Sequence, residues 1–345
     1  SPGAGEKPLS GLFFRAEGDD GDDLWVTDGT VSGTSTEDLS PGAGSSVPDD
    51  FTLIGDRLFF SAINNGTGRE LWSTLGPNQT FLVADLEAGS SSSSPRALTV
   101  LGDDLYFSAE VAGSRALYTV DSVTMVLTEV AYGIVEVDFD TEIVEDNSRV
   151  YFKGTASSGG GREIWASDGT TPGTEQATNL GCPEWGELLG VGTSVFVVCD
   201  FGSSTELFRV DPTPAAGVVL VHRFGDRTVE QLTPSGGTLY MVVGGEDIWA
   251  YDNGTGSVSQ VTAFGAGGFP DHLTRYLGNL VFSADGDEGR ELHWTDGATV
   301  TEIDIRPGSP SSNPYNLLVH DGLVYFIADD GVHGEELWVL NTAPD

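Results

Sequence analysis

Residues 58–72 read LFFSAINNGTGRELW, and this pattern returns along the whole chain. It opens with an apolar, aromatic string at 58–60 and closes with Glu70-Leu71-Trp72. A turn rich in Asn and Gly separates the two strings. Short apolar and aromatic runs bounded by such turns are typical of β-strands. The stretch therefore predicts two strands joined by a tight turn.

The aromatic string occurs eight times at intervals of 41–47 residues: 12–14, 58–60, 105–107, 150–152, 195–197, 239–241, 280–282 and 324–326. The second string follows each copy: 23–25, 70–72, 116–118, 163–165, 206–208, 247–249, 291–293 and 336–338. Each unit also has an apolar segment before these two strings and another after them. Four strands per unit of this length are the signature of a β-propeller blade.

We therefore predict an all-β fold, a β-propeller of about eight four-stranded blades. Seven blades plus an extra hairpin remain an alternative, and a solenoid is the competing repeat architecture. The whole chain, residues 1–345, forms one predicted domain. Its predicted units are 1–47, 48–94, 95–138, 139–186, 187–228, 229–269, 270–312 and 313–345. Unit 1 lacks a full first strand and unit 8 a fourth, so either thin blades are tolerated or a neighbour adds strands.

The fuller motif resembles the ELWxxDGT-repeat proteins. Residues 23–34, 163–174 and 291–297 carry this resemblance, and units 3, 5 and 6 are more divergent. In unit 7, His293 takes the Trp position and Trp294 falls one residue later, on the opposite strand face. The resemblance implies a secreted or surface-displayed protein and transfers no catalytic residue.

The charge of the chain excludes some partners. It has 53 acidic and 15 basic residues, a net charge of −38. Such a surface repels nucleic acid and anionic membranes. It attracts divalent cations and basic partners. No apolar run approaches the roughly 20 residues that a membrane helix needs, so we expect no membrane insertion.

Antiparallel order places alternate connections at the same end of a blade. The turns between second and third strands should therefore share one rim with the loops that join blades. Cys182 lies in such a loop and Cys199 ends a second strand, so we predict a disulfide on this rim. The alternative is two buried free thiols.

Acidic, Gly-containing turns on this rim are candidate Ca²⁺ sites, because Ca²⁺ prefers several carboxylate oxygens on a tight loop. The predicted ligands are Asp19, Asp20, Asp22, Asp285, Asp287, Glu291, Asp329 and Asp330. The alternative is ordinary Asp-Gly turns with solvated carboxylates.

Other recurring residues are interpreted structurally. The Asp-Gly-Thr segments suit hairpin turns, and the repeated Trp positions suit packing between blades. Trp185 breaks the pattern, because it falls in a predicted rim loop, and it is a candidate for stacking on a sugar. Asn65, Asn78 and Asn253 begin glycosylation sequons in predicted turns.

Together these features favour a non-enzymatic, extracellular or cell-surface protein with a structural or adhesion role. We expect protein or glycan partners, a surface or filament assembly through the incomplete terminal blades, and stabilisation by Ca²⁺. A carbohydrate-binding, lectin-like propeller is the alternative, and a polysaccharide-active enzyme is the third possibility. The five histidines are scattered, and no catalytic constellation is legible.

Overall fold

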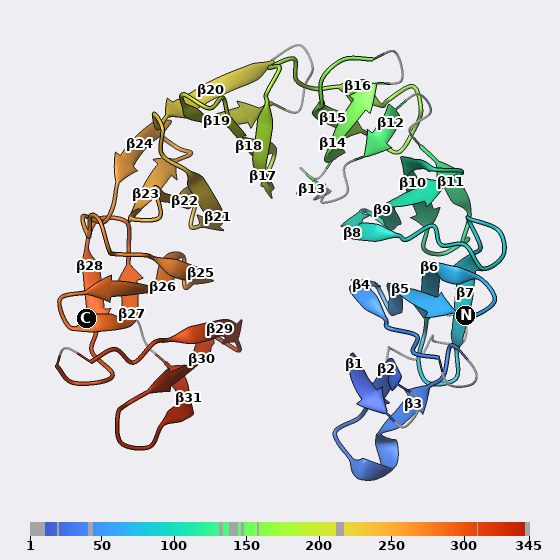
Figure 1. Cartoon of the computed structure of the whole chain (residues 1–345), viewed down its shortest axis with the longest axis horizontal. Helices are drawn as coiled ribbons and strands as arrows, with labels where there is room; N and C mark the ends of the chain where they lie inside the picture. Colours follow the sequence, from blue (N-terminus) through green and yellow to red (C-terminus); the bar gives the residue numbers. More distant parts are fainter. Residues whose placement is uncertain are drawn as a thin grey trace, which may run out of the picture. The chain divides into compact units, whose positions relative to one another are not determined.

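The structure, a computed structural model, describes residues 11–18, 21–40, 44–130, 134–137, 144–145, 148–156, 159–211, 217–308 and 310–341. The predicted all-β class is confirmed: the described residues form strands and one 3₁₀ turn, Val31–Gly33. None of these residues belongs to a helix that could cross a membrane. The chain divides into two compact units (Figure 1). One consists of Ser1–Gly181, Gly192–Val195 and Asp211–Gly217, and the other of Cys182–Val191, Phe196–Val210 and Val218–Asp345.

The first unit begins with two antiparallel sheets in simple chain order. The first sheet comprises β1 (Leu12–Gly18), β2 (Gly21–Thr27) and β3 (Ser35–Glu37). The second comprises β4 (Asp49–Ile54), β5 (Arg57–Asn64), β6 (Gly68–Thr74) and β7 (Thr80–Ala84). The second sheet has the four strands that the repeat predicts.

The next two repeats join in one nine-stranded sheet. Its strands are β8 (Arg96–Leu101), β9 (Asp104–Val111), β10 (Ser114–Asp121), β11 (Leu127–Glu129), β12 (Ile134–Val137), β13 (Val144–Glu145), β14 (Val150–Ala156), β15 (Glu163–Ser167) and β16 (Glu175–Gln176). Strand β12 pairs with β10 in parallel and with β14 antiparallel, and so connects the two repeats. The sequence predicted two separate blades here.

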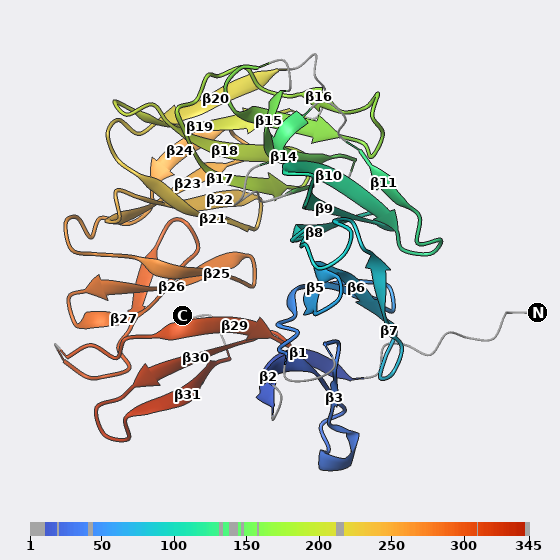
Figure 2. The same cartoon turned by 45° about the vertical axis from the view of Figure 1, so that its right-hand side comes forward.

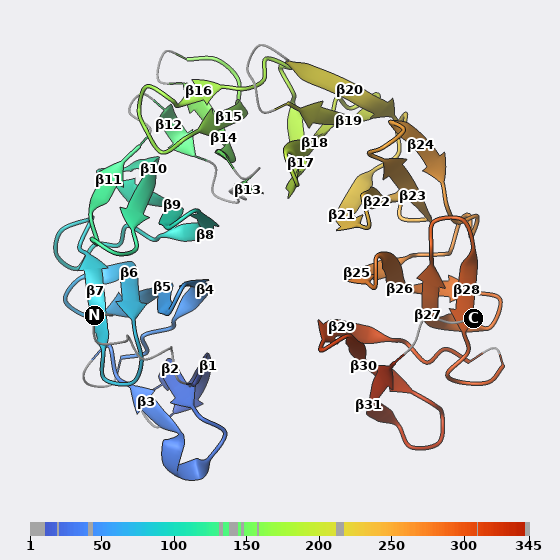
Figure 3. The ribbon, with the colours of Figure 1, turned by 180° about the vertical axis from the view of Figure 1, so that it is seen from behind.

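Strands β17–β31 form four further antiparallel sheets, the first three with four strands each. The first is β17 (Glu184–Val191), β18 (Ser194–Asp200), β19 (Thr205–Val210) and β20 (Val218–Arg223). The next are β21 (Val229–Ser235), β22 (Thr238–Val243), β23 (Asp247–Asp252) and β24 (Ser257–Gln260), then β25 (Asp271–Tyr276), β26 (Asn279–Gly286), β27 (Gly289–Thr295) and β28 (Val300–Ile303). The last is β29 (Tyr315–His320), β30 (Leu323–Asp329) and β31 (Glu335–Leu340). Within the second unit, β21, β25 and β29 contact one another in succession (Figures 2 and 3).

The two recurring strings pair across each hairpin in one register. Phe60 lies opposite Trp72, and Phe152 lies opposite Trp165. In the seventh repeat Phe282 lies opposite His293, so the predicted replacement of Trp by His at this position is confirmed. Cross-strand aromatic pairs of this kind stabilise a sheet and help to fix its register.

The apolar core lies between neighbouring sheets. In six clusters, an apolar residue of one third strand packs against the aromatic string of the next repeat. The contacts are Leu24 with Leu58 and Phe60, Leu71 with Leu105 and Phe107, Leu117 with Val150 and Phe152, Leu207 with Leu239 and Met241, Ile248 with Leu280 and Phe282, and Leu292 with Val324 and Phe326. Burying one such side chain stabilises the fold by about 1.5–3 kcal/mol.

The repeated Trp residues join these clusters. Trp72 packs against Leu24 of the preceding sheet, and Trp165, Trp249 and Trp338 pack against clusters of their own. This confirms the predicted packing role at four of the five repeated Trp positions. Trp25 instead stacks on Phe14 of its own sheet.

Candidate functional site

The turns between second and third strands lie beside the loops that join repeats, as predicted. The backbone N–H of Asp285, near the end of β26, donates to the carbonyl of Gly268 in the preceding loop at 2.7 Å. In the same way, the N–H of Asp329 donates to the carbonyl of Ser312 at 2.9 Å, and the N–H of Glu110 donates to the carbonyl of Ser93 at 2.7 Å. We call this edge, made of the turns and the joining loops, the loop rim.

A buried carboxylate fastens each of several joining loops to the loop rim. Glu70 accepts bonds from the N–H groups of Ser93 at 2.7 Å and Leu86 at 3.1 Å, and from the Ser93 hydroxyl. Its side chain is inaccessible to solvent. Burial raises the pKa of Glu70, while the bonds from Ser93 and Leu86 act in the opposite direction. The carboxyl group therefore fastens the joining loop to the third strand at two N–H groups and one hydroxyl.

The same arrangement recurs at equivalent positions, which we call the loop-clamp carboxylates: Asp23, Glu70, Glu163, Asp247 and Glu291. Sequence reasoning missed this role. The signal was an acidic residue at a fixed place before the apolar-aromatic pair, with a Ser or Thr hydroxyl farther along the chain. The hydroxyl partner lies 15–23 residues away, so the pairing was not visible locally.

Glu291, one of the predicted metal ligands, is one of these loop-clamp carboxylates. Its carboxylate is fully buried and accepts bonds from the N–H groups of Ser312 at 2.8 Å and Ile305 at 3.0 Å. The Ser312 hydroxyl donates to it as well. Its oxygens are therefore committed to the joining loop, whereas Asp287 of the adjacent turn is exposed.

Three of the other predicted Ca²⁺ ligands face arginines. Asp22 pairs with Arg15, Asp285 pairs with Arg290 at 3.0 Å, and Asp329 pairs with Arg306 at 3.2 Å. A cation would have to compete with these guanidinium groups. Asp19 and Asp20 lie outside the described residues.

Asp330 accepts bonds from its own turn. The N–H and then the imidazole of His333 hold the pKa of Asp330 at about 2, with a further bond from the N–H of Val332. Within the described ranges, no three His, Cys, Asp or Glu side chains are grouped as metal ligands. Calcium binding stays a prediction.

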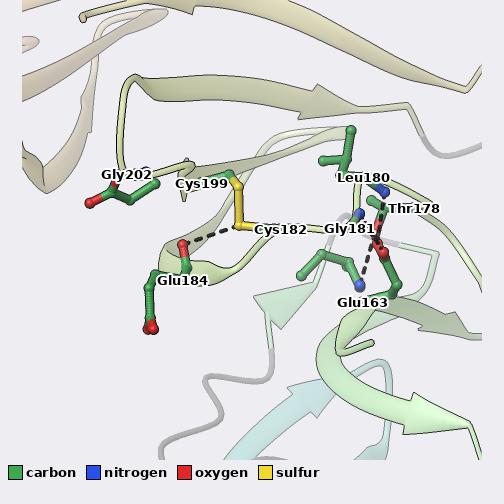
Figure 4. Close-up of a disulfide and its surroundings, with 10 residues drawn as sticks. Glu163, Thr178, Leu180, Gly181, Cys182, Glu184, Cys199 and Gly202 are labelled. Carbon is green, nitrogen blue, oxygen red and sulfur yellow. Dashed lines mark hydrogen bonds between the residues drawn. A yellow bond between two sulfur atoms is a disulfide. The ribbon is translucent and has the colours of Figure 1, made fainter. Parts of the chain in front are cut away.

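The predicted disulfide between Cys182 and Cys199 is confirmed (Figure 4). It joins the segment before β17 to the end of β18, across 17 residues of sequence. Trp185 is not in a loop: it is the second residue of β17 and is half-buried. Pro183 and the nearby Cys182 made this segment resemble a loop. Stacking of Trp185 on a sugar stays a prediction.

The remaining predicted positions lie in turns. Asp28 accepts from the N–H and hydroxyl of Thr30, and Asp168 does the same with Thr170, as a structural turn requires. The sequon residues Asn65, Asn78 and Asn253 are exposed in turns.

A cavity of about 410 Å³ opens on the loop rim of the seventh repeat. The loop after β24, the turn between β26 and β27, and Glu302 of β28 surround it. Its lining residues are Ala263, Phe264, Ala266, Gly267, Gly268, Asp285, Gly286, Asp287 and Glu302. Two of the predicted acidic residues, Asp285 and Asp287, thus line a real concavity.

His293 lies behind this cavity and is 1% exposed. Its ring stacks on Phe282 at a centroid distance of 5.4 Å and meets Phe264 edge-on at 5.2 Å. Burial lowers the pKa of His293. Burial raises the pKa of the neighbouring Glu302, and nearby carboxylates including Glu291 raise it further. The cavity therefore combines a neutral imidazole with an acid whose charge is disfavoured.

The fold defines this chain as a β-propeller-like all-β protein, and solved structures share it. Dipeptidyl peptidase 4 of Porphyromonas gingivalis has a TM-score of 0.64 at 9% identity, over 98% of this chain and 57% of that one. A prolyl endopeptidase has a TM-score of 0.54 at 13% identity, over 85% and 49%. The computationally designed protein Ika8 has a TM-score of 0.52 at 15% identity, over 96% and 98%.

This chain therefore spans about half the length of the two peptidases. At these identities the similarity concerns the fold alone. No family model and no curated protein matches the sequence. The membership of the ELWxxDGT-repeat family stays a prediction.

Proposed function

We propose that this chain is a non-catalytic extracellular β-propeller of eight blades, which acts as a structural or adhesion module by binding further copies of itself. The disulfide supports an oxidising compartment, because such bonds persist mainly in secreted and surface proteins. The observation that carries the proposal is an apolar face on the last sheet, β29–β31.

Leu337 of β31 is 72% exposed. Its counterparts in the other repeats are each 0% exposed: Leu24, Leu71, Leu117, Ile164, Leu207, Ile248 and Leu292. Val339 and Leu318 on the same side of the sheet are 51% and 62% exposed. With Tyr325 and Ile327 they form the last-sheet face. Exposed apolar patches of this kind mark interaction surfaces.

The repeat itself indicates what would cover this face. In all six described clusters, the residue at the Leu337 position packs against the aromatic string of a following repeat. The first sheet exposes such a string. Leu12 is 67% exposed, whereas its counterparts, Leu58, Leu105, Val150, Val195, Leu239, Leu280 and Val324, are 0–7% exposed. Phe14 and Trp25 lie on the same side of that sheet and form, with Leu12, the first-sheet face.

We therefore propose that the last-sheet face of one copy packs against the first-sheet face of a second copy, and pairing of the two faces within one chain is the outcome that a monomer would indicate. The two faces differ, so the contact is head-to-tail, and such contacts extend into rings or filaments. The interface would repeat the packing that already joins sheets within the chain.

The test is sedimentation velocity of the full chain over a wide concentration range. We expect oligomers that grow with concentration, and a loss of assembly in Leu337→Glu and in Leu12→Glu. An equimolar mixture of these two variants should form dimers only, because each variant keeps one intact face. Val332→Glu, at a 79% exposed site in the β30–β31 turn, is the matched control and should assemble like the wild type.

A monomer at every concentration would overturn the proposal. Wild-type assembly in both face variants would overturn it as well, because the contact would then lie elsewhere.

A further inference from the structure

The cavity of the seventh repeat exists where the repeat departs from its own pattern. In the first sheet, the indole of Trp25 lies over Gly18, and a Cβ at Gly18 would be 3.4 Å from that ring. Gly286 holds the same register position in the seventh repeat, four residues after Phe282. A Cβ at Gly286 would meet the Glu302 carboxylate at 2.6 Å and His293 Nε2 at 3.1 Å. Replacing Trp by the smaller His has therefore left room for a carboxylate beside the turn.

One buried carboxyl oxygen in this space lacks a hydrogen-bond donor. His293 Nδ1 lies 3.2 Å from the carbonyl oxygen of Glu291, so it carries the proton and donates there. Nε2 is then an acceptor, and it lies 3.8 Å from Oε2 of Glu302. Glu302 Oε1 is shut off from solvent and has no hydrogen-bond partner. Glu302 Oε1 is thus the buried acceptor that lacks a donor in this space, and one buried unpaired polar atom costs about 1–3 kcal/mol.

The charge and shape of the lining indicate what would supply the donors. Arg290 pairs with Asp285, which leaves Asp287 as an exposed carboxylate at the cavity, beside Glu302, whose raised pKa a bound cation would lower. The ring of Phe264 and the backbone of Gly267 and Gly268 form the remaining walls. The volume of about 410 Å³ suits a small molecule, not a macromolecular segment.

We propose that this cavity binds a small ligand carrying a primary ammonium group. An ammonium group offers three donors and a positive charge, which fits the unpaired oxygen of Glu302 and the carboxylate of Asp287. The ring of Phe264 can add a cation–π contact. The glycine backbone lets the rest of the ligand approach closely. This site is independent of the proposed assembly, because the last-sheet and first-sheet faces contribute nothing to it.

The test is isothermal titration calorimetry of the full chain at 0.15 M NaCl with two probes, glucosamine and lysine. N-acetylglucosamine is the matched neutral analogue of the first. We expect saturable one-to-one binding of the amines. Glu302→Gln keeps the side-chain shape and should weaken binding roughly tenfold or more, the factor expected for one charge-assisted hydrogen bond. His293→Trp restores the residue of the other repeats, fills the space and should abolish binding.

Asp252→Asn is the control for non-specific attraction to an acidic protein. Asp252 is exposed at the end of β23 in the preceding sheet, and its variant should bind like the wild type. Equal binding by Glu302→Gln and wild type would overturn the proposal, as would equal binding of N-acetylglucosamine and glucosamine. If His293→Trp fails to fold by circular dichroism, Glu302→Gln alone decides the result.

Discussion

At the scale of single residues, position determines what a carboxylate does in this protein. Glu70 and Asp287 belong to the same kind of repeat, yet one is buried in bonds to a loop and the other is exposed. The sequence predicted the acidic turns correctly as turns, but it could not separate Glu291 from them. That distinction depends on Ser312, 21 residues away, which only the folded sheet brings close.

Truncation of a loop-clamp carboxylate should be costly. Glu70→Ala leaves the N–H groups of Ser93 and Leu86 without an acceptor, so we expect a loss of about 2–4 kcal/mol in the free energy of unfolding. Thermal and urea denaturation followed by circular dichroism measure it. Glu129→Ala, at an exposed strand position, is the control and should change the stability little.

The same site gives a pH dependence with a definite sign. The pKa of Glu70 is raised in the folded state, so its protonated form is favoured by folding. Its contribution is therefore fully present below the unfolded value of 4.5 and is lost as pH rises through the folded pKa. Glu70→Gln mimics the protonated acid and should be milder than Glu70→Ala. If Glu70→Gln and Glu70→Ala lowered the free energy of unfolding equally at neutral pH, the hydrogen-bonding role of Glu70 would be contradicted.

At the scale of elements, the local sequence pattern predicted the strands well because the two strands of each hairpin are adjacent in the sequence. The aromatic string and the Glu-Leu-Trp string found their partners within about ten residues, and the register of His293 opposite Phe282 followed from that spacing. Strand β12 was not predictable in this way. Its parallel pairing with β10 is a contact between repeats, and it merges two predicted blades into one sheet. The cavity was likewise invisible, because three separate segments surround it.

The disulfide acts on one element, the β17–β18 hairpin. Closing a loop of 17 residues should stabilise the fold by about 3 kcal/mol in the chain-entropy description. We expect the Cys182→Ser/Cys199→Ser double variant to unfold at a lower temperature by the corresponding amount. Reduction of the wild type should produce the same shift and leave the double variant unchanged. A shift on reduction in the double variant would show that the reductant acts elsewhere.

At the scale of the whole molecule, charge is the dominant feature. A net charge of −38 repels itself, and salt screens that repulsion. Composition alone established this, and it also motivated the Ca²⁺ prediction. In the structure, arginines pair with carboxylates of three acidic turns. Composition counts 15 basic residues but does not say which carboxylates they contact.

Thermal unfolding separates screening from specific binding. NaCl should raise the unfolding temperature gradually, with no saturation at low concentration. If the turns bind Ca²⁺, millimolar CaCl₂ should raise it further than MgCl₂ at the same ionic strength, and EDTA should reverse the effect. Binding to the folded state alone adds about 2.7 kcal/mol at a hundredfold excess over Kd. Equal shifts of the unfolding temperature with CaCl₂ and MgCl₂ would show that the turn carboxylates are solvated and do not bind Ca²⁺ specifically.

The loop-clamp carboxylate also has a genetic consequence. Glu70 and the loop that it holds, through Ser93, lie within 23 residues of each other. A DNA segment that encodes one repeat therefore copies the strand, its clamp and the loop together. Duplication or deletion of a whole unit would need no compensating change elsewhere in the gene. Insertions between Glu70 and Ser93 would lengthen the loop without removing the pair, as the spacing of 15–23 residues among the repeats already shows.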